Sequence, residues 1–311
     1  MYLVITYKIY FGEDIMSKLI NNNTRFMRSS SNSLMDLYSF VELYQKGTKP
    51  LIYIRGYNGK LTINTKRILD NAPDDFNLIK YYNEFWYDSN IHIPYIIDFN
   101  YKKCIKNGLI KKEEINLKLF SDSVIDILEK ANLQNVDIIG SSSGGTIALL
   151  CSKSNRVDKV SVISPTIPFD YFASQDKLSK SKFNSILNLS YYLASLLYWD
   201  KKYGFMKDFE STYSDPNILK QNIDSSKCFI LAGDIEKTIG KNFFDIVKEF
   251  SYLIFARMIE KETGFKSDGR IITDENYYKN IGVNYEITND NFHMYCNKEY
   301  LLKRTYENLK K

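Results

Sequence analysis

The sequence predicts an α/β protein with a doubly wound, mostly parallel sheet and an inserted helical cap. Short apolar runs recur along the chain, longer helical patterns separate them, and one charge-free segment interrupts the alternation. Continuous apolar strands separated by helices are typical of a parallel sheet that is covered on both faces. The functional site of such a sheet is expected at the carboxyl ends of its strands.

Residues 1–46 are predicted to form an extension of strands and a helix that packs on the core. The run 2–10 alternates and is rich in β-branched and aromatic residues, which favours a strand. The polar stretch 21–33 can hold a short second strand. Residues 33–47 space their apolar side chains as in a helix, and Gly47 suits its C-cap.

The α/β core is predicted over 47–165 and 223–311. Its strands are expected in six apolar runs of five or six residues: 51–56, 95–99, 136–140, 160–164, 228–233 and 283–287. Its helices are expected at about 114–131, directly after Gly144, and at about 241–262.

Residues 166–222 are predicted to be the cap. Within them, 183–199 carries no charged residue, which predicts a buried or half-buried helix. Two other interpretations stay open, namely a lid over an apolar pocket and peripheral contact with a lipid surface. No run of about 18 apolar residues occurs, so no membrane-spanning helix is expected.

Composition excludes several function classes. The 42 basic and 37 acidic residues give a net charge of +5 without a basic run, so nucleic-acid binding is not expected. Four dispersed cysteines and two histidines do not form a zinc motif, and no metal or cofactor is expected. Three of the thiols, Cys151, Cys228 and Cys296, are predicted to be buried and free. The N-terminus lacks a signal-peptide pattern, so a cytoplasmic location is expected.

A short Gly/Ser corner follows the apolar run 136–140. Residues 140–144 satisfy G-x-S-x-G, centred on Ser142. A nucleophile on a sharp strand-to-helix turn has strained backbone angles, and small residues two positions away let strand and helix approach. The N–H groups of the following helix would help to hold an oxyanion. Ser141 and Ser143 can alternatively cap that helix.

In this strand–corner–helix context the chain resembles the α/β-hydrolases from about Leu51 to the C-terminus. The resemblance implies Ser142 as nucleophile, then an acid after a later strand, then a histidine near the end. His293, just before a predicted terminal helix, is the implied base. Glu236, three residues after Gly233, is the favoured acid, and Asp234 is the alternative.

The same resemblance implies an oxyanion hole made by the backbone N–H groups of Ser143 and Tyr57. The family often has His-Gly where this chain has Arg55 and Gly56. Arg55 would place a cation at the mouth of the site and favour a substrate with a carboxylate or phosphate. Alternatively, Arg55 pairs with an acidic neighbour and only orders the loop.

The expected function is therefore that of a serine hydrolase acting on a small ester or acyl substrate. It would cleave a carboxylic ester or thioester through an acyl-enzyme on Ser142, with His293 as base. The same triad serves an acyltransferase, and the sequence does not select the acceptor. A non-catalytic accessory protein of this fold is a third hypothesis, for which the long insertion at 240–280 and Arg55 leave room.

Overall fold

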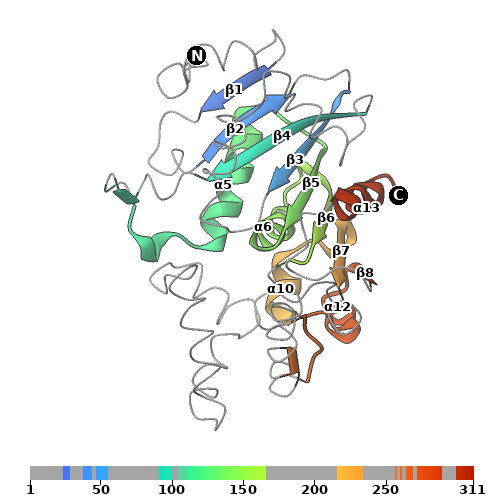
Figure 1. Cartoon of the computed structure of the whole chain (residues 1–311). Coiled ribbons are helices and arrows are strands. Elements are labelled where there is room, and N and C mark those ends of the chain that lie inside the picture. The colour runs from blue at the N-terminus through green and yellow to red at the C-terminus, as the bar shows by residue number, and fades with distance from the viewer. Residues whose placement is uncertain are drawn as a thin grey trace, which may run out of the picture.

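The computed structural model describes the chain in several ranges and a few single positions: 24–28, 38–43, 47–54, 91–99, 105–106, 108, 110–165, 216–233, 256–257, 260, 264–268, 272–288 and 299–311. Its centre is an eight-stranded sheet with the order β1-β2-β4-β3-β5-β6-β7-β8 (Figure 1). The strands are β1 (Thr24–Arg28), β2 (Tyr38–Leu43), β3 (Lys49–Ile54), β4 (His92–Phe99), β5 (Val136–Ser141), β6 (Val157–Ile163), β7 (Cys228–Gly233) and β8 (Asn284–Thr288).

The sheet is parallel from β4 to β8 and antiparallel only where β2 joins β1 and β4. All six strands predicted for the core are present, and the short strand expected within 21–33 is β1. Every residue of β5 is buried, which is the pattern of a strand covered on both faces. The predicted mostly parallel sheet is confirmed.

The helix predicted over 33–47 is wrong, because residues 38–43 form β2. In register, Phe40 lies between Met27 of β1 and Ile97 of β4. The segment is short and aromatic-rich, a length at which helix and strand periodicities are easily confused, and pairing on both sides decides in favour of a strand. β1 and β2 thus extend the central sheet, and the strand predicted at 2–10 lies outside the described residues.

Gly47 has a different role from the predicted helix C-cap. A Cβ atom at this position would lie 2.5 Å from the backbone nitrogen of His92. The next two N–H groups, of Thr48 and Lys49, donate to the carbonyl oxygen of Ile91 at 3.1 and 3.0 Å. Gly47 therefore lets β3 begin directly beside β4.

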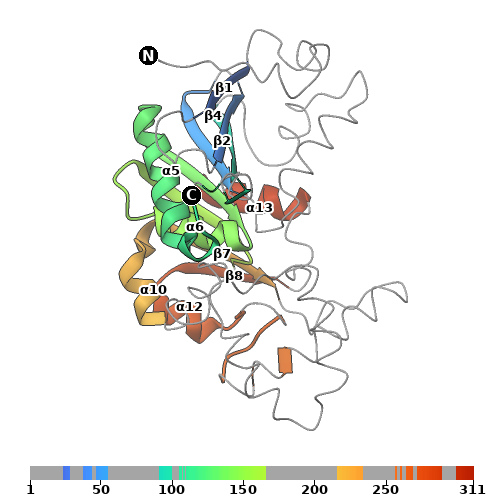
Figure 2. The ribbon, with the colours of Figure 1, turned by 90° about the vertical axis from the view of Figure 1, so that its left-hand side faces the viewer.

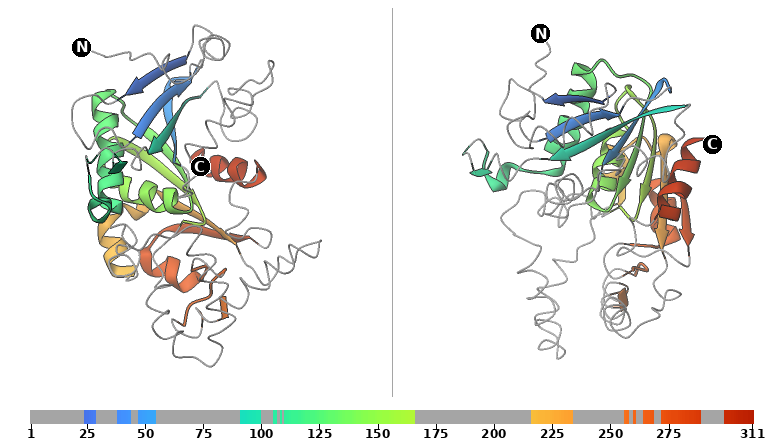
Figure 3. Two further views of the ribbon diagram at one scale, coloured as in Figure 1. Left: turned by 60° about the vertical axis from the view of Figure 1, so that its left-hand side comes forward. Right: turned by 45° about the horizontal axis from the view of Figure 1, so that its top comes forward.

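The described helices cover both faces of the sheet. They are η3 (Lys112–Glu114), α5 (Leu117–Lys130), α6 (Ser143–Cys151), α10 (Pro216–Asn222), η5 (Ser225–Lys227), α12 (Glu275–Ile281) and α13 (Glu299–Leu309). Figures 2 and 3 show α5, α6 and α10 on one face of the sheet and α13 on the other. In the described part of the chain, no helix has the length and apolar character needed to cross a membrane.

The helices expected at 114–131, after Gly144 and at the C-terminus are present as α5, α6 and α13. The helix expected at 241–262 lies almost wholly outside the described residues, and α12 was not predicted. The cap prediction also lies outside them, apart from α10. Leu219 of α10 is fully buried in the hydrophobic core.

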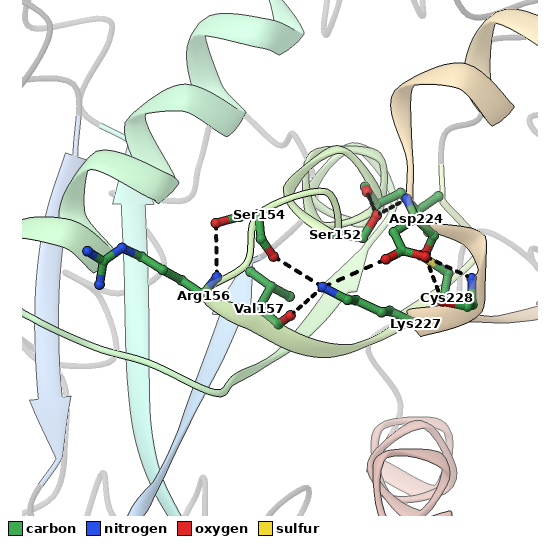
Figure 4. Close-up of polar contacts among 9 residues, drawn as sticks. Ser152, Ser154, Arg156, Val157, Asp224, Lys227 and Cys228 are labelled. Atoms are coloured by element: carbon green, nitrogen blue, oxygen red, sulfur yellow. Dashed lines mark hydrogen bonds and ion pairs between the residues drawn. The ribbon is translucent and has the colours of Figure 1, made fainter.

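Lys227 fastens the start of β7 to the start of β6. Its ammonium donates to the carbonyl oxygens of Ser154 and Val157 at 3.2 and 2.9 Å (Figure 4). The N–H of Asp224 donates to the Ser152 hydroxyl at 2.8 Å, which joins the end of α6 to η5. These contacts hold together the edge at which the parallel strands begin, which we call the amino edge. The candidate site lies at the opposite, carboxyl edge, where these strands end.

Two cysteines are buried free thiols, as predicted: Cys151 and Cys228. Burial raises the pKa of Cys151 far above its usual value and that of Cys228 to about 12. Both side chains therefore act as small apolar groups of the core. Cys296 lies outside the described residues.

Candidate functional site

The candidate site is built around the backbone of Ser142. This residue stands between β5 and α6 with φ 53° and ψ −129°. A serine in this region carries backbone strain of about 1–3 kcal/mol, which persists only where the surroundings enforce it. The strained turn is the geometry that the G-x-S-x-G spacing predicts.

Main-chain hydrogen bonds hold this strained turn on both sides. The Ser142 N–H donates to the carbonyl oxygen of Ile163, at the end of β6, at 3.0 Å. The Ser142 carbonyl oxygen accepts from the N–H groups of Gly145 and Thr146 at 2.9 and 3.4 Å. The turn is therefore fastened to the next strand and to the helix that it begins.

Gly140 provides the space for the turn. A Cβ atom on Gly140 would lie 2.6 Å from the Gly144 carbonyl oxygen and 2.7 Å from the Gly145 Cα atom. Such distances are below normal contact, so any larger residue would push the start of α6 away from β5. Gly145 faces a similar limit, because its Cβ atom would lie 3.0 Å from Pro165.

The three neighbouring serines have different environments. Ser141 is the last residue of β5 and Ser143 is the first of α6, and both are buried. The helix cap position falls on Ser142, so the alternative that Ser141 or Ser143 caps the helix is wrong. Ser142 is half-buried, and its side chain makes no capping hydrogen bond. Its hydroxyl is thus not used to begin the helix.

The amino end of α6 can stabilise a negative charge near Ser142. The first N–H groups of a helix have no partner within the helix, and the helix dipole is positive there. The first turn of α6 contains no acidic residue that would already use this field. The Ser143 N–H begins this turn and directly follows the candidate nucleophile.

The neighbouring strand ends in a second strained serine, which the sequence analysis did not identify. Ser164 follows β6, is fully buried and has φ 42°. Its N–H donates to the carbonyl oxygen of Leu231 in β7 at 2.8 Å. Main-chain hydrogen bonds thus connect the carboxyl ends of β5, β6 and β7. The only local signal was the Ser-Pro pair at 164–165, which favours a turn.

The structure does not test the other predicted site residues. Arg55, Tyr57, Asp234, Glu236 and His293 all lie outside the described residues. The strands that precede these residues, β3, β7 and β8, end at the same edge of the sheet as β5, which precedes Ser142. β3 ends at Ile54, which pairs in register with Gly140, and β7 and β8 end side by side at Gly233 and Thr288.

These features define the fold. The sheet is mostly parallel and covered on both faces, and a strained serine stands between one of its central strands and the next helix. A strained serine between a strand and a helix is the backbone geometry that the G-x-S-x-G spacing predicts. The chain has the α/β-hydrolase fold.

No protein-family model and no curated protein matches the chain. Among solved structures it is similar to naproxen esterase from Bacillus subtilis, at 12% identity over 96% of this chain and 95% of that one, with a TM-score of 0.45. It is similar to a lipase from Bacillus licheniformis, at 16% identity over 85% and 92% of the two chains, with a TM-score of 0.45. It is also similar to α/β hydrolase domain-containing protein 10 from mouse, at 14% identity over 92% and 98%, with a TM-score of 0.43. Likenesses this distant do not identify a reaction.

Within the described part of the chain, no group of three or more His, Cys, Asp or Glu side chains is placed to bind a metal ion. The described part of the site contains a hydroxyl group on a strained turn, at the amino end of a helix.

Proposed function

We propose that the protein is a serine hydrolase that cleaves a small carboxylic ester or thioester through an acyl-enzyme on Ser142. The observation that carries the proposal is the strained backbone of Ser142, at φ 53° and ψ −129°. Strain in a non-glycine residue costs stability and is typical of functional sites. At a position needed only for a tight turn, glycine adopts positive φ without this cost, as Gly282 does at the end of α12.

The proposed reaction begins when the Ser142 hydroxyl attacks the substrate carbonyl carbon while His293 takes its proton. The negative charge that develops on the carbonyl oxygen is held by the N–H groups of Ser143 and Tyr57. Glu236, or Asp234, orients the imidazole and stabilises its charged form.

Collapse of this intermediate expels the alcohol or thiol, which His293 protonates, and leaves the acyl group on Ser142. Water then attacks the acyl-enzyme with His293 again as base, and the carboxylic acid leaves. Arg55 at the mouth of the site would favour substrates that also carry a carboxylate or phosphate.

The test is intact-mass measurement after treatment with a fluorophosphonate, a reagent that phosphonylates activated serines. We expect one adduct on the wild type, none on Ser142→Ala, and an unchanged adduct on Ser141→Ala, the matched control in the same corner. A panel of p-nitrophenyl esters of increasing acyl length would then define the substrate class.

A folded wild-type protein that takes up no adduct would contradict the hydrolase proposal. The non-catalytic hypothesis would then gain, and it predicts that Ser142→Ala leaves partner binding unchanged. An adduct combined with faster acyl transfer to an added alcohol than to water would instead identify an acyltransferase.

A further inference from the structure

A buried polar cluster lies at the amino edge of the sheet, opposite the candidate site. His92, the first residue of β4, has Nε2 2.9 Å from Asp137 Oδ2 and Nδ1 2.8 Å from the Tyr306 hydroxyl of α13. The His92 and Tyr306 rings meet edge to face, with centroids 5.3 Å apart. Asp137 precedes Ser142 by five residues of β5, or about 16 Å along a strand. The cluster is therefore separate from the candidate active site.

The cluster is built to hold a fully buried carboxylate. Burying an unpaired charge is costly, so such a group requires partners for both of its oxygens. His92 contacts Asp137 Oδ2, and the Lys49 ammonium lies 2.8 Å from Oδ1, in an ion pair whose geometry is not that of a hydrogen bond. Lys49 also donates to Asp158 Oδ2 at 2.7 Å. Residues from β3, β4, β5 and β6 thus meet at one point.

Tyr306 connects α13, the last helix of the chain, to this cluster. Its contact with His92 is buried, whereas two other contacts of α13 with the sheet are closer to solvent. The Lys159 ammonium donates to the Leu309 carbonyl oxygen at 3.0 Å, and Arg304 pairs with Glu286 of β8. The contact of Tyr306 with His92 is therefore a buried polar link between α13 and the sheet, beside the apolar packing of Leu301 and Leu309.

We propose that Tyr306, His92 and Asp137 act as positioning residues for the histidine base. Ten residues, 289–298, join the end of β8 to the start of α13, and His293 is among them. One end of this connection is held by the pairing of β8 with β7, and the other is held by α13. Fixing α13 through Tyr306 therefore fixes one of the two anchors of the segment that carries the base. The inference rests on the proposed role of His293.

The variant Tyr306→Phe removes the hydroxyl and keeps the ring. We expect faster hydrogen exchange in a peptide covering 289–298, with unchanged exchange in β5 and β6. We also expect the rate of fluorophosphonate labelling of Ser142 to fall about tenfold at a temperature where the variant is fully folded, because small displacements of a catalytic group cost rate. Lys303→Ala, an exposed change on the same helix, should alter neither quantity.

A double-mutant cycle separates positioning from general stability. In a His293→Ala background, Tyr306→Phe should cause no further loss of labelling rate, because the group on which it acts is already absent. An equal loss in both backgrounds, or unchanged exchange in 289–298, would overturn the inference. His92→Gln removes the same contact from the sheet side, because its amide nitrogen can replace Nε2 at Asp137 but not Nδ1 at Tyr306. It should reproduce both effects, so the test remains possible even if Tyr306→Phe does not fold.

The two proposals fail in different ways. A wild-type protein that takes up no fluorophosphonate contradicts the proposed function. Normal labelling of the wild type, together with normal exchange and labelling in Tyr306→Phe, contradicts only the positioning role.

Discussion

At the scale of single residues, the strained turn at Ser142 depends on the absence of a side chain at Gly140. Ser142 carries an unfavourable φ of 53°, and Gly140 leaves the space in which that turn fits. Both requirements act over a few residues of chain, which is why the G-x-S-x-G spacing could predict them. The predicted partners of Ser142 come from distant segments, and the structure leaves those predictions untested.

The variant Gly140→Ala should damage the corner without removing its hydroxyl. A Cβ atom 2.6 Å from a backbone oxygen forces the start of α6 to move, at a cost of about 1–3 kcal/mol. We expect a lower melting temperature together with slower labelling of Ser142.

The control for this change is Gly108→Asn. Gly108 also has a positive φ, of 69°, but a Cβ atom at this position would find open space, with nothing beyond its two neighbours in the chain within 4 Å. Asparagine tolerates that conformation, so the control should stay close to the wild type in both measurements. Wild-type melting and labelling in Gly140→Ala would contradict the close-packed corner described above.

At the scale of elements, the two errors of sequence interpretation concern short segments. β2 has six residues and α12 has seven, and hydrophobic periodicity is weak over such lengths. The signals that would have identified α12 are its two ends. Asp274 caps the first turn, and Gly282 ends the helix with φ 81°. β2 is a strand because it pairs with β1 on one side and β4 on the other. A local sequence pattern does not reveal such pairing.

The variant Asp274→Ala should destabilise α12. The carboxylate accepts from the N–H groups of Asn276 and Tyr277 at 2.8 and 3.4 Å, and losing such a cap costs about 1 kcal/mol. Urea unfolding should show this loss, while Asp274→Asn, which keeps a capping oxygen, should lose much less. Equal losses in the two variants would contradict the capping explanation and point to the second carboxylate oxygen, which accepts from the Lys266 N–H at 3.1 Å.

At the scale of the whole molecule, the two edges of the sheet have different chemistry. The carboxyl edge carries the strained serines, and the amino edge carries the paired charges. The sequence predicted the first edge because strand ends and small residues are local features. The second edge joins His92 to residues 45 and 214 positions away. Contacts of that range follow from the strand order, which the sequence alone did not provide.

The charged amino edge predicts how stability depends on pH. The hydrogen bond from Lys49 lowers the pKa of Asp158. Burial opposes the charge on Lys49, but Asp137 and Asp158 outweigh it and raise the Lys49 pKa. A lowered carboxylate pKa stabilises the fold above the unfolded-state value of about 4, and this contribution is lost as pH falls through the folded-state value. A raised lysine pKa stabilises the fold below about 10.4, and this contribution is lost as pH rises through the folded-state value.

The pair should therefore contribute fully between these limits. At pH 7, Asp158→Asn should lower the free energy of unfolding by less than about 1 kcal/mol, because both groups are partly exposed. The difference from the wild type should shrink once the pH falls below about 4. Urea unfolding at both pH values tests this, with Glu113→Gln as an exposed control. A difference that is the same at both pH values would contradict the ion-pair explanation.

The strand order also has a consequence for the newly made chain as it leaves the ribosome. β3 lies between β4 and β5 in the sheet, yet it precedes both in the sequence. Five of its six residues, Pro50 to Ile54, are buried in the finished protein. During synthesis they have no parallel partner until residue 99 has been made, and no second one until residue 141. β3 is therefore an unpaired apolar strand until β4 has been made, and it keeps one unpaired side until β5 follows. Exposed segments of this kind are prone to aggregation and are bound by chaperones.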